Sequence, residues 1–450
     1  IEDTDVQRSG EEMVRAILDG LSWLGLDWDE EPVFQSSRFP LYRERAEELI
    51  QKGAAYRCYC TREEIEAERK QAQAEGRTYK YSGRCRHLTA EQREAFEREG
   101  RKPVVRFWVK PGVTEFHDHV HGTVRVDHEQ IGDFVILRSD GIPTYHLAVV
   151  VDDHDMGISH VIRGDDHLTN TPKHLMLYEA FGWAAPEFAH VPLILGPDKK
   201  RLSKRHGATS IGEYAERGYL PEALLNFIAL LGWSPDDDRE IMSRQELIDA
   251  FDLAGINKAS AVFDEKKLEW MNGEYIARTD VDRLVGLVRP FFQREFGWSD
   301  EQFEAQVQRV RQCVSLLRNR AKKLTDFAVY GRYFFFEPET FEPKGVRKHF
   351  RDPDVPRRLR AVAEKLEGLK RFTAGEIEAV VRSLAEEFGL SAAKLIHPVR
   401  LAVTGFTVGP SLFELLEALG REVVVGRLRR VAEKLERGEI AAEAAEAAST

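Results

Sequence analysis

The sequence Pro197-Asp-Lys-Lys-Arg-Leu-Ser-Lys-Arg-His-Gly207 concentrates positive charge in a chain whose net charge is −11. Its cations are Lys199, Lys200, Arg201, Lys204 and Arg205. Fixed ammonium and guanidinium groups can neutralise the charge that develops while a phosphoryl or nucleotidyl group is transferred. The stretch therefore fits a loop that binds a polyphosphate. A solvated basic surface loop is the alternative, because basic runs are common on protein surfaces.

Three largely apolar segments around this loop predict the sheet to which it belongs. Residues 147–151, 158–162 and 191–195 have the continuous hydrophobic pattern of buried parallel strands. A helix that begins at Thr171-Pro172 separates the second segment from the third. The third segment leads directly into the basic loop. We therefore expect a nucleotide-binding α/β domain with this loop after one of its strands.

The α/β domain is interrupted, and a helical half follows it. Short β-rich runs at residues 104–109, 122–126 and 134–137 predict an insertion with a small sheet of its own. After the basic loop, amphipathic patterns predict helices to the end of the chain. The clearest of these cover residues 221–231, 310–327, 361–369, 377–388 and 412–419.

Composition limits the class of protein. A chain of 450 residues suits roughly two to four domains. Its hydrophobic content of 42% and charged content of 31% are typical of soluble globular proteins. No apolar run approaches the length of a membrane span and no signal peptide opens the chain. Four cysteines are too few for a disulfide scaffold, so we expect a cytoplasmic protein. The sequence contains no long apolar face that would indicate a dimer interface, so we expect a monomer.

Cysteines in the insertion have the spacing of a metal site. Cys58-Tyr-Cys60 and Cys85-Arg-His87 are two ligand pairs, each with one intervening residue, and Thr61 begins a predicted helix between them. Two pairs that close over a helical excursion are typical of structural zinc sites. The sequence therefore predicts Zn²⁺ bound by Cys58, Cys60, Cys85 and His87. The alternative is four unrelated residues in a polar lobe.

Three histidines alternate along His117-Asp-His119-Val-His121. Residues two apart share one face of a strand, so the three imidazoles would lie together. A second metal site is one interpretation. The solvated face of an edge strand is the favoured one, because no carboxylate or thiol partner lies at a regular spacing from the histidines.

Polar side chains lie at the ends of the predicted strands. Tyr145 enters one strand, and Arg163 leaves another and is followed by Asp165 and Asp166. Ligands of open α/β sheets bind at the carboxyl ends of the strands. The guanidinium fork of Arg163 matches a carboxylate, which makes it a candidate for binding an acidic ligand. Pairing of Arg163 with Asp165 or Asp166 is the alternative.

Together these motifs resemble bacterial glutamyl-tRNA synthetase, a family of class I aminoacyl-tRNA synthetases. Arg201-Leu-Ser-Lys-Arg205 resembles the second class I signature, the lysine–serine–lysine loop, with arginine in place of the first lysine. The other segments that carry the resemblance are residues 1–5, 145–153, 160–167, 202–210, 263–273 and 401–405. The resemblance as a whole covers nearly the whole chain. The first class I signature, His-x-Gly-His, precedes the segment matching Ile1 in this family, so we expect that an N-terminal segment with part of the ATP site is missing here. Whether the fragment is active without it does not follow from the sequence.

The resemblance implies a reaction in two steps. L-Glutamate reacts with ATP, with Mg²⁺, to give glutamyl adenylate and pyrophosphate, and the glutamyl group then passes to tRNA(Glu) with release of AMP. Neither step needs a protein nucleophile, because positioning and charge stabilisation suffice.

Roles for individual residues follow from the same resemblance. Lys204 stabilises the leaving pyrophosphate, with Arg205 and Ser203 beside it. Asp166, Arg201 and Lys204 border ATP. The substrate pocket contains Glu2 for the α-amino group, Arg163 for the side-chain carboxylate, and Tyr145. The anticodon residues are Arg320, Arg400 and Pro410.

Arg320 lies in Leu317-Arg-Asn-Arg-Ala-Lys-Lys-Leu324, which carries four cations in eight residues. The resemblance implies that Arg320 reads the third anticodon base, which is C in tRNA(Glu) and G in tRNA(Gln). Arg400 and Pro410 match positions that hold the first anticodon bases. A solvated basic face, or a face that touches only phosphates, is the alternative.

The resemblance also implies the domain organisation and the fold class. We expect a Rossmann-type catalytic domain at residues 1–51 and 142–200. An α+β acceptor-binding insertion with the zinc site occupies residues 52–141. All-α domains follow: a stem-contact domain at 201–280, and anticodon-binding domains at 281–370 and 371–450.

Three alternatives to glutamyl-tRNA synthetase are open at this point. Glutaminyl-tRNA synthetase usually has β-barrels at its anticodon end, whereas this end is helical. The short paralogue that glutamylates a tRNA base has no anticodon domain. A non-catalytic tRNA-binding or scaffold protein fits the absence of the first signature. Whether tRNA(Gln) is also charged does not follow from the sequence.

Overall fold

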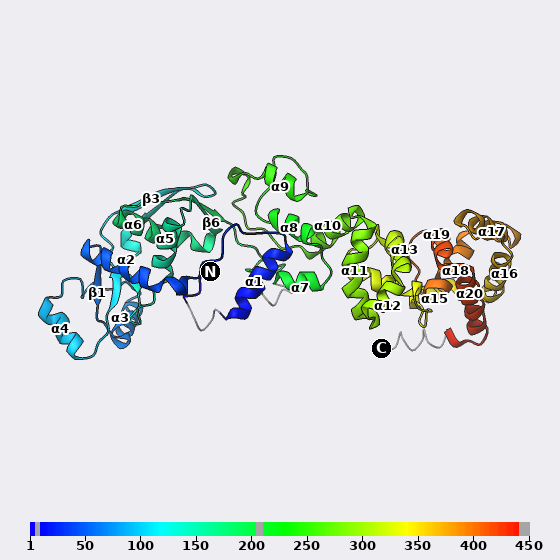
Figure 1. Cartoon of the computed structure of the whole chain (residues 1–450), viewed down its shortest axis with the longest axis horizontal. Coiled ribbons are helices and arrows are strands. Elements are labelled where there is room, and N and C mark those ends of the chain that lie inside the picture. Colours follow the sequence, from blue (N-terminus) through cyan, green and yellow to red (C-terminus); the bar gives the residue numbers. More distant parts are fainter. Residues whose placement is uncertain (5–9, 204–209, 441–450) are drawn as a thin grey trace. The chain divides into compact units, whose positions relative to one another are not determined.

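The structure is a computed structural model that describes residues 1–4, 10–203 and 210–440 (Figure 1). The chain forms two compact units. The first comprises Ile1–Gly212 and Leu225–Asp264, and the second comprises Glu213–Leu224 and Glu265–Thr450. The finer domain boundaries expected from the sequence remain predictions.

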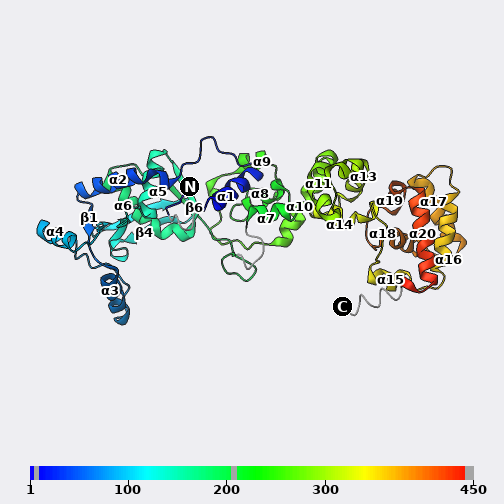
Figure 2. The same cartoon turned by 60° about the horizontal axis from the view of Figure 1, so that its bottom comes forward.

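The first unit contains a three-stranded antiparallel sheet in the order β1-β2-β5. Its strands are β1 (Ala55–Cys58), β2 (Val104–Phe107) and β5 (Phe134–Leu137). The helices α2 (Phe39–Gln51), α5 (Tyr145–Asp155) and α6 (Thr171–Phe181) share an apolar core with it. The helices α3 (Arg62–Ala74) and α4 (Ala90–Arg98) lie at the edge of the unit in both views (Figures 1 and 2). Thr61 caps α3 through a capping box, as predicted.

A second sheet has the order β4-β3-β7-β6. Its strands are β3 (Val113–Asp118), β4 (Gly122–Asp127), β6 (His160–Gly164) and β7 (Glu187–Val191). The pairs β6–β7 and β3–β7 are parallel, and β3–β4 is antiparallel. The prediction that the insertion has a sheet of its own is therefore wrong in one respect. Its hairpin β3–β4 extends the parallel sheet, while β2 and β5 pair with β1.

Two predicted strands are also corrected. Residues 147–151 lie in helix α5, in which Leu147 through Asp152 are all buried. An apolar run that is covered on every side has the same pattern in a helix as in a parallel strand, so periodicity alone did not separate them. The strand predicted at 191–195 ends at Val191. Pro192 follows it, and proline has no N–H to donate to a ladder.

The remaining helices of the first unit are α1 (Glu11–Trp23) and α9 (Arg244–Ala250), with α7 (Ile211–Glu216) and α8 (Pro221–Ala229) crossing the boundary between the units. A small core around Trp233, Met242 and Ile256 packs against β7 through Ala189. None of the described helices combines the length and hydrophobicity that crossing a membrane requires.

The second unit is helical and is built around one hydrophobic core. Its helices are α10 (Glu265–Arg278), α11 (Val281–Phe296), α12 (Asp300–Ala305), α13 (Val307–Leu317), α14 (Thr325–Tyr330), α15 (Pro343–His349), α16 (Val355–Glu367), α17 (Ala374–Glu387), α18 (Ala393–Thr404), α19 (Leu412–Leu419) and α20 (Arg421–Glu436). Figure 2 shows α16, α17, α18 and α20 gathered in one cluster.

The single helix predicted at residues 310–327 is wrong. Helix α13 ends at Leu317 and α14 begins at Thr325. Between them the Asp326 carboxylate accepts hydrogen bonds from the backbone N–H groups of Lys322 and Lys323, at 2.7 and 3.0 Å. Leu317, Ala321 and Leu324 are all buried, so the hydrophobic pattern continues through the turn. The turn places Arg320 between two helices rather than on one.

Candidate functional site

A pocket of about 380 Å³ lies in the first unit, at the carboxyl end of β6. It is lined by Glu2, Tyr145, Val149, Asp153, Val161, Arg163, Gly164, Asp166, His167 and Arg201. The structure therefore brings together five residues that the sequence analysis selected: Glu2, Tyr145, Arg163, Asp166 and Arg201. These residues lie far apart in the chain, and they come together because β6, α5 and the N-terminal segment border the same cavity.

Arg163 is held in this pocket by uncharged partners. Its Nε donates to His190 Nε2 at 3.2 Å, and its Nη1 donates to the Tyr145 hydroxyl at 2.9 Å. Its Nη2 donates to Thr171 Oγ1 at 2.9 Å. Both terminal nitrogens lie 3.4 Å from His174 Nδ1. Asp166 instead forms an ion pair with Arg201 at 3.1 Å. The contacts of Arg163 given above therefore hold its guanidinium in position, and none of them is with a carboxylate.

A buried dyad behind Arg163 orients it. Asp118 and His190 are both fully buried, and His190 Nδ1 lies 2.6 Å from Asp118 Oδ2. Because Nδ1 donates to the carboxylate, Nε2 of the neutral ring is free to accept from Arg163. Burial lowers the pKa of His190 although Asp118 opposes the shift, so the ring is neutral at pH 7. Backbone N–H groups of Val120 and His121 also donate to Asp118, at 3.0 and 2.9 Å.

Sequence reasoning missed both members of this dyad. Asp118 lies within the His-Asp-His-Val-His motif, which was interpreted through its histidines. His190 lies in β7 in register with Arg163 of β6. The dyad forms only because β3 pairs with β7 at Asp118 and Phe188, a contact between segments some 70 residues apart. No local sequence pattern predicts a strand pairing between segments so far apart in the chain.

Two carboxyl groups in the pocket have raised pKa values. Burial raises the pKa of Glu2, and the nearby charge of Arg163 opposes the shift. Burial raises the pKa of Asp153 to about 6, with Arg163 lowering it and Asp152 and Glu2 raising it further. Two carboxylates that repel each other favour a bound cation. The pocket therefore offers a guanidinium for an anion and two carboxyls for a cation.

The basic stretch is described only in part. Leu195 and Arg201 form an antiparallel bridge, and Gly196 N–H donates to Lys200 O at 2.7 Å. This turn brings Arg201 to the pocket. Lys204 and Arg205 lie outside the described residues, while Ser203 is the last described residue before them.

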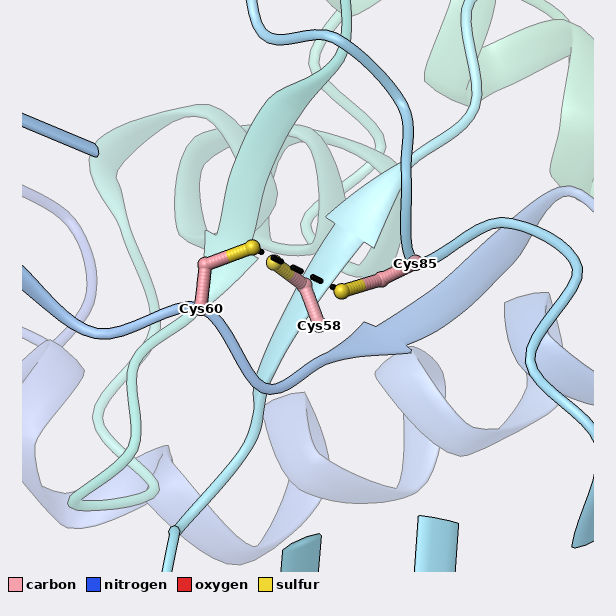
Figure 3. A group of neighbouring side chains, drawn as sticks. All are labelled: Cys58, Cys60 and Cys85. Atoms are coloured by element: carbon pink, nitrogen blue, oxygen red, sulfur yellow. Dashed lines mark hydrogen bonds between the residues drawn. The ribbon is translucent and has the colours of Figure 1, made fainter. Parts of the chain in front are cut away.

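The predicted metal ligands Cys58, Cys60 and Cys85 come together in the first unit (Figure 3). Their sulfur atoms lie within 4.8 Å of one another, and Cys60 Sγ is 3.5 Å from Cys85 Sγ. All three cysteines are free thiols. The pKa of Cys58 is lowered, because Cys60 and Cys85 hydrogen-bond to its sulfur.

Neighbours of the three sulfurs fit a thiolate site. Arg84 Nε donates to Cys60 Sγ at 3.1 Å, and Arg106 Nε donates to Cys58 Sγ at 3.3 Å. The Tyr81 hydroxyl lies 3.3 Å from Cys58 Sγ and 3.1 Å from Cys60 Sγ.

The fourth predicted ligand, His87, is exposed, and its ring packs edge-on against Trp108. It is not in the group of ligand atoms that lie within 4.8 Å of one another. Sequence reasoning missed Tyr81. Among the hydrogen bonds described above, its hydroxyl is the oxygen that lies closest to the cysteine sulfur atoms. Its position four residues before Cys85 was the available signal.

The second unit contains a larger pocket of about 870 Å³. Its lining includes the predicted Arg320, the cations Lys322 and Lys323, and the aromatic rings of Tyr330, Tyr333 and Phe406. Arg320 is exposed. Cationic side chains beside aromatic rings are typical of sites for nucleic-acid bases.

The other two predicted anticodon residues contact each other. Arg400 Nη1 donates to the carbonyl oxygen of Pro410 at 2.8 Å. Burial lowers the pKa of Arg400, with the Arg320 charge adding to the shift and Tyr333 opposing it. Gly409 lines the pocket, and a Cβ at this position would lie 2.8 Å from Arg400 Nη1. Glycine therefore allows the Arg400–Pro410 contact to form.

The two units correspond to known protein families. Residues 1–270 match the family described as tRNA synthetases class I (E and Q), catalytic domain, and residues 283–432 match the anticodon binding domain family. The fold and the pocket therefore define a class I aminoacyl-tRNA synthetase of the group named for glutamate and glutamine.

Similar proteins narrow the family. The chain is 47% identical to glutamate–tRNA ligase 1 of Caldanaerobacter subterraneus subsp. tengcongensis, over 97% of the chain and 90% of that protein. It is 46% identical to the glutamate–tRNA ligase of Moorella thermoacetica, over 96% and 90%. The crystal structure of a glutamate tRNA ligase from Elizabethkingia meningosepticum, in complex with its amino acid, matches with a TM-score of 0.86 and 34% identity, over 97% of this chain and 92% of that one.

The chain belongs to the glutamate–tRNA ligase family of bacteria. The expected class I fold with a helical anticodon end is thereby confirmed. The match to an anticodon binding domain disagrees with the short paralogue, which has none. The relatives favour glutamate–tRNA ligase over glutaminyl-tRNA synthetase and over a non-catalytic tRNA-binding protein.

Proposed function

We propose that this protein attaches L-glutamate to tRNA(Glu) in an ATP-dependent reaction that passes through glutamyl adenylate and releases AMP and pyrophosphate. The observation that carries the proposal is the pocket at the end of β6, where Arg163 hydrogen-bonds only to uncharged partners and the carboxyl groups of Glu2 and Asp153 line the same cavity. This charge pattern complements an amino acid with an acidic side chain.

In this proposal the side-chain carboxylate of glutamate accepts hydrogen bonds from Arg163 and Tyr145. Both groups line the cavity, and Arg163 Nη1 and the Tyr145 hydroxyl are 2.9 Å apart, so one carboxylate can reach both. The α-ammonium group lies toward Glu2 and Asp153. A charge-assisted hydrogen bond is about twice as strong as a neutral one, so a neutral amide is a poorer ligand for the same guanidinium.

The nucleotide lies beside Asp166, Arg201 and the basic loop. Lys204 stabilises the charge that develops on the leaving pyrophosphate, with Arg205 and Ser203 beside it, and Mg²⁺ accompanies the ATP. The Arg201–Asp166 ion pair supports the placement of the loop at this pocket. No protein nucleophile takes part, because the enzyme acts by positioning and by stabilising charge.

The tRNA is bound by both units in this proposal. The insertion at residues 52–141 grips the acceptor end and residues 201–280 contact the stem. The helical domains at 281–370 and 371–450 bind the anticodon, where Arg320 reads the third base and Arg400 with Pro410 holds the first bases. The support is the pocket that combines Arg320 with the rings of Tyr330 and Phe406. The protein works as a cytoplasmic monomer.

A structural Zn²⁺ binds at Cys58, Cys60 and Cys85, with Tyr81 or His87 as the fourth ligand. Zinc prefers thiolates in a closed tetrahedral site, and donors from Arg84 and Arg106 stabilise sulfur in the ionised form. We expect close to one zinc per chain by elemental analysis after metal-replete expression. Comparing Tyr81→Phe with His87→Ala identifies the fourth ligand, and only trace zinc in the wild-type protein would rule the site out.

The proposed activity is tested by aminoacylation with the full-length gene product. Radiolabelled glutamate, ATP, Mg²⁺ and tRNA(Glu) should give acid-precipitable glutamyl-tRNA, and glutamine should not replace glutamate. ATP–pyrophosphate exchange is measured in parallel with tRNA present. A protein that binds tRNA(Glu) but forms neither adenylate nor glutamyl-tRNA is a tRNA-binding protein, and the proposal then fails.

A further inference from the structure

A second cluster of metal-binding groups lies on the parallel sheet, away from the cysteines in the sequence. His119, His160 and Glu187 each offer one ligand atom, and these atoms lie within 4.8 Å of one another. His119 Nε2 is 2.5 Å and His160 Nε2 is 3.7 Å from the same oxygen, Glu187 Oε2. The carboxylate that the histidine motif lacked in the sequence is therefore supplied by β7. No local sequence pattern predicts this contact between the histidines and Glu187.

Backbone pairing fixes the three positions before any ligand arrives. His160 and Glu187 are register partners at the start of the parallel strands β6 and β7. His119 follows β3 directly, and its backbone N–H donates to Phe188 O at 2.9 Å. A metal ion bound here needs to order only side chains, because the strands already hold the backbone in place.

The cluster is open to a cation from solvent. All three groups reach solvent, with side-chain exposures of 29% for His119, 43% for His160 and 61% for Glu187. A hydrated ion can therefore enter directly. Two imidazoles and one carboxylate with open positions suit Zn²⁺, Ni²⁺ or Co²⁺ rather than Ca²⁺ or Mg²⁺.

The strands that carry these ligands also carry the dyad behind Arg163. His119 is adjacent to Asp118, His160 precedes Arg163 by three residues, and Glu187 precedes His190 by three residues. An ion on the cluster would link β3, β6 and β7 at one end of the short ladder whose other end holds Arg163 and His190.

We infer that His119, His160 and Glu187 form a second divalent transition-metal site, which clamps β3, β6 and β7 together. Water completes the coordination. The site is distinct in chemistry from the cysteine cluster, since it has nitrogen and oxygen ligands and no thiolate. It stabilises the parallel sheet and takes no part in bond making.

The test uses Ni²⁺ as the probe, on full-length protein whose cysteine site has been loaded with zinc and dialysed. Calorimetry should detect one Ni²⁺ per chain with a micromolar Kd, and the bound ion should raise the Tm. His119→Ala and His160→Ala should each weaken binding by about tenfold or more, since even indirect supports of a metal site are worth 10–100-fold. Near-ultraviolet absorbance separates this binding from Ni²⁺ bound to thiolates.

His117→Ala is the matched control, because it removes an exposed imidazole from the same motif but none of the three ligands. It should change the Kd by less than about threefold, so that a loss equal to that of His119→Ala would mean non-specific binding by surface histidines. Unchanged Ni²⁺ binding in the double variant His119→Ala/His160→Ala would also overturn the inference. Circular dichroism of each variant shows that the sheet is intact.

Discussion

Two arginines, one in each unit, are proposed to read different substrates, and their surroundings differ. Arg163 is partly buried on a strand, and its nitrogens contact His190, Tyr145 and Thr171 within 3.2 Å. Arg320 lies in the exposed turn after α13, and its side chain makes no hydrogen bond or ion pair within the described part of the chain. One guanidinium is positioned before its ligand binds and the other is not.

The difference has an energetic consequence. A free arginine side chain carries about 2 kcal/mol of rotamer entropy, part of which is lost when it binds a base. Arg163 has already lost that freedom on folding, so more of its interaction energy is available for the ligand. We therefore expect substitutions around Arg163 to have large effects on glutamate, and substitution of Arg320 to have a moderate effect on the choice of tRNA.

The largest expected effect comes from Arg163→Gln. Removing one partner of a desolvated charge pair typically costs about 2–5 kcal/mol, so kcat/KM for glutamate should fall about thirtyfold or more. The preference for glutamate over glutamine should narrow as well. The matched control is Arg138→Gln, which removes an exposed arginine from the same unit and should stay within about threefold of wild type. Wild-type discrimination in Arg163→Gln would mean that another residue reads the side chain.

A smaller effect is expected from the dyad that orients Arg163. His190→Ala removes the acceptor for Arg163 Nε, and we expect KM for glutamate to rise about tenfold with a smaller change in kcat. His190→Gln, whose amide oxygen can accept and whose amide nitrogen can donate to Asp118, should recover part of the loss. Steady-state kinetics and Tm are measured together. A lowered Tm with unchanged KM would assign His190 a structural role only.

Part of this contrast was predictable from sequence. Arg163 could be predicted as a ligand-binding residue, because it lies both at the end of a predicted strand and in the family motif at residues 160–167. Its orienting partner His190 was not found, because the β6–β7 and β3–β7 pairings bring distant segments together. Arg320 was placed on a helix, because Leu317, Ala321 and Leu324 keep a helical pattern through the turn that holds it. Periodicity reports burial, and burial does not distinguish a helix from a turn packed on the same core.

The stability of the protein should depend on pH through Asp153, which lines the same pocket as Arg163. Its pKa of about 6 is raised by burial, opposed by Arg163 and increased by Asp152 and Glu2. A raised carboxyl pKa means that the folded state binds the proton more tightly than the unfolded state, so stability falls as pH rises from about 4 through 6. Asp153→Asn should therefore raise the Tm by about 2–4 °C at pH 7.5 and leave it unchanged at pH 4. An equal rise at both pH values would contradict the shifted pKa.

Arg320→Gln should have the smallest effect on catalysis and should act on tRNA choice. A guanidinium that reads a base edge gives about 1–3 kcal/mol of discrimination. The preference for tRNA(Glu) over tRNA(Gln) with a CUG anticodon should therefore relax about tenfold, with little change in salt dependence. Lys348→Gln, which removes an exposed cation elsewhere in the same unit, is the control. Equal weakening for both tRNAs, with a lower salt slope, would mean that Arg320 contacts only phosphate.

In the proposed function two separate arginines read glutamate and the anticodon: Arg163, which other side chains hold in place, and Arg320, which has no such support in the described part of the chain. This assignment is tested most directly by kcat/KM for glutamylation of tRNA(Glu) and tRNA(Gln) by the wild-type enzyme, Arg163→Gln, Arg320→Gln and the double variant. We expect Arg163→Gln to lower the rate on both tRNAs about equally, Arg320→Gln to change only their ratio, and the two effects to add. An altered tRNA ratio in Arg163→Gln, or an altered KM for glutamate in Arg320→Gln, would contradict it.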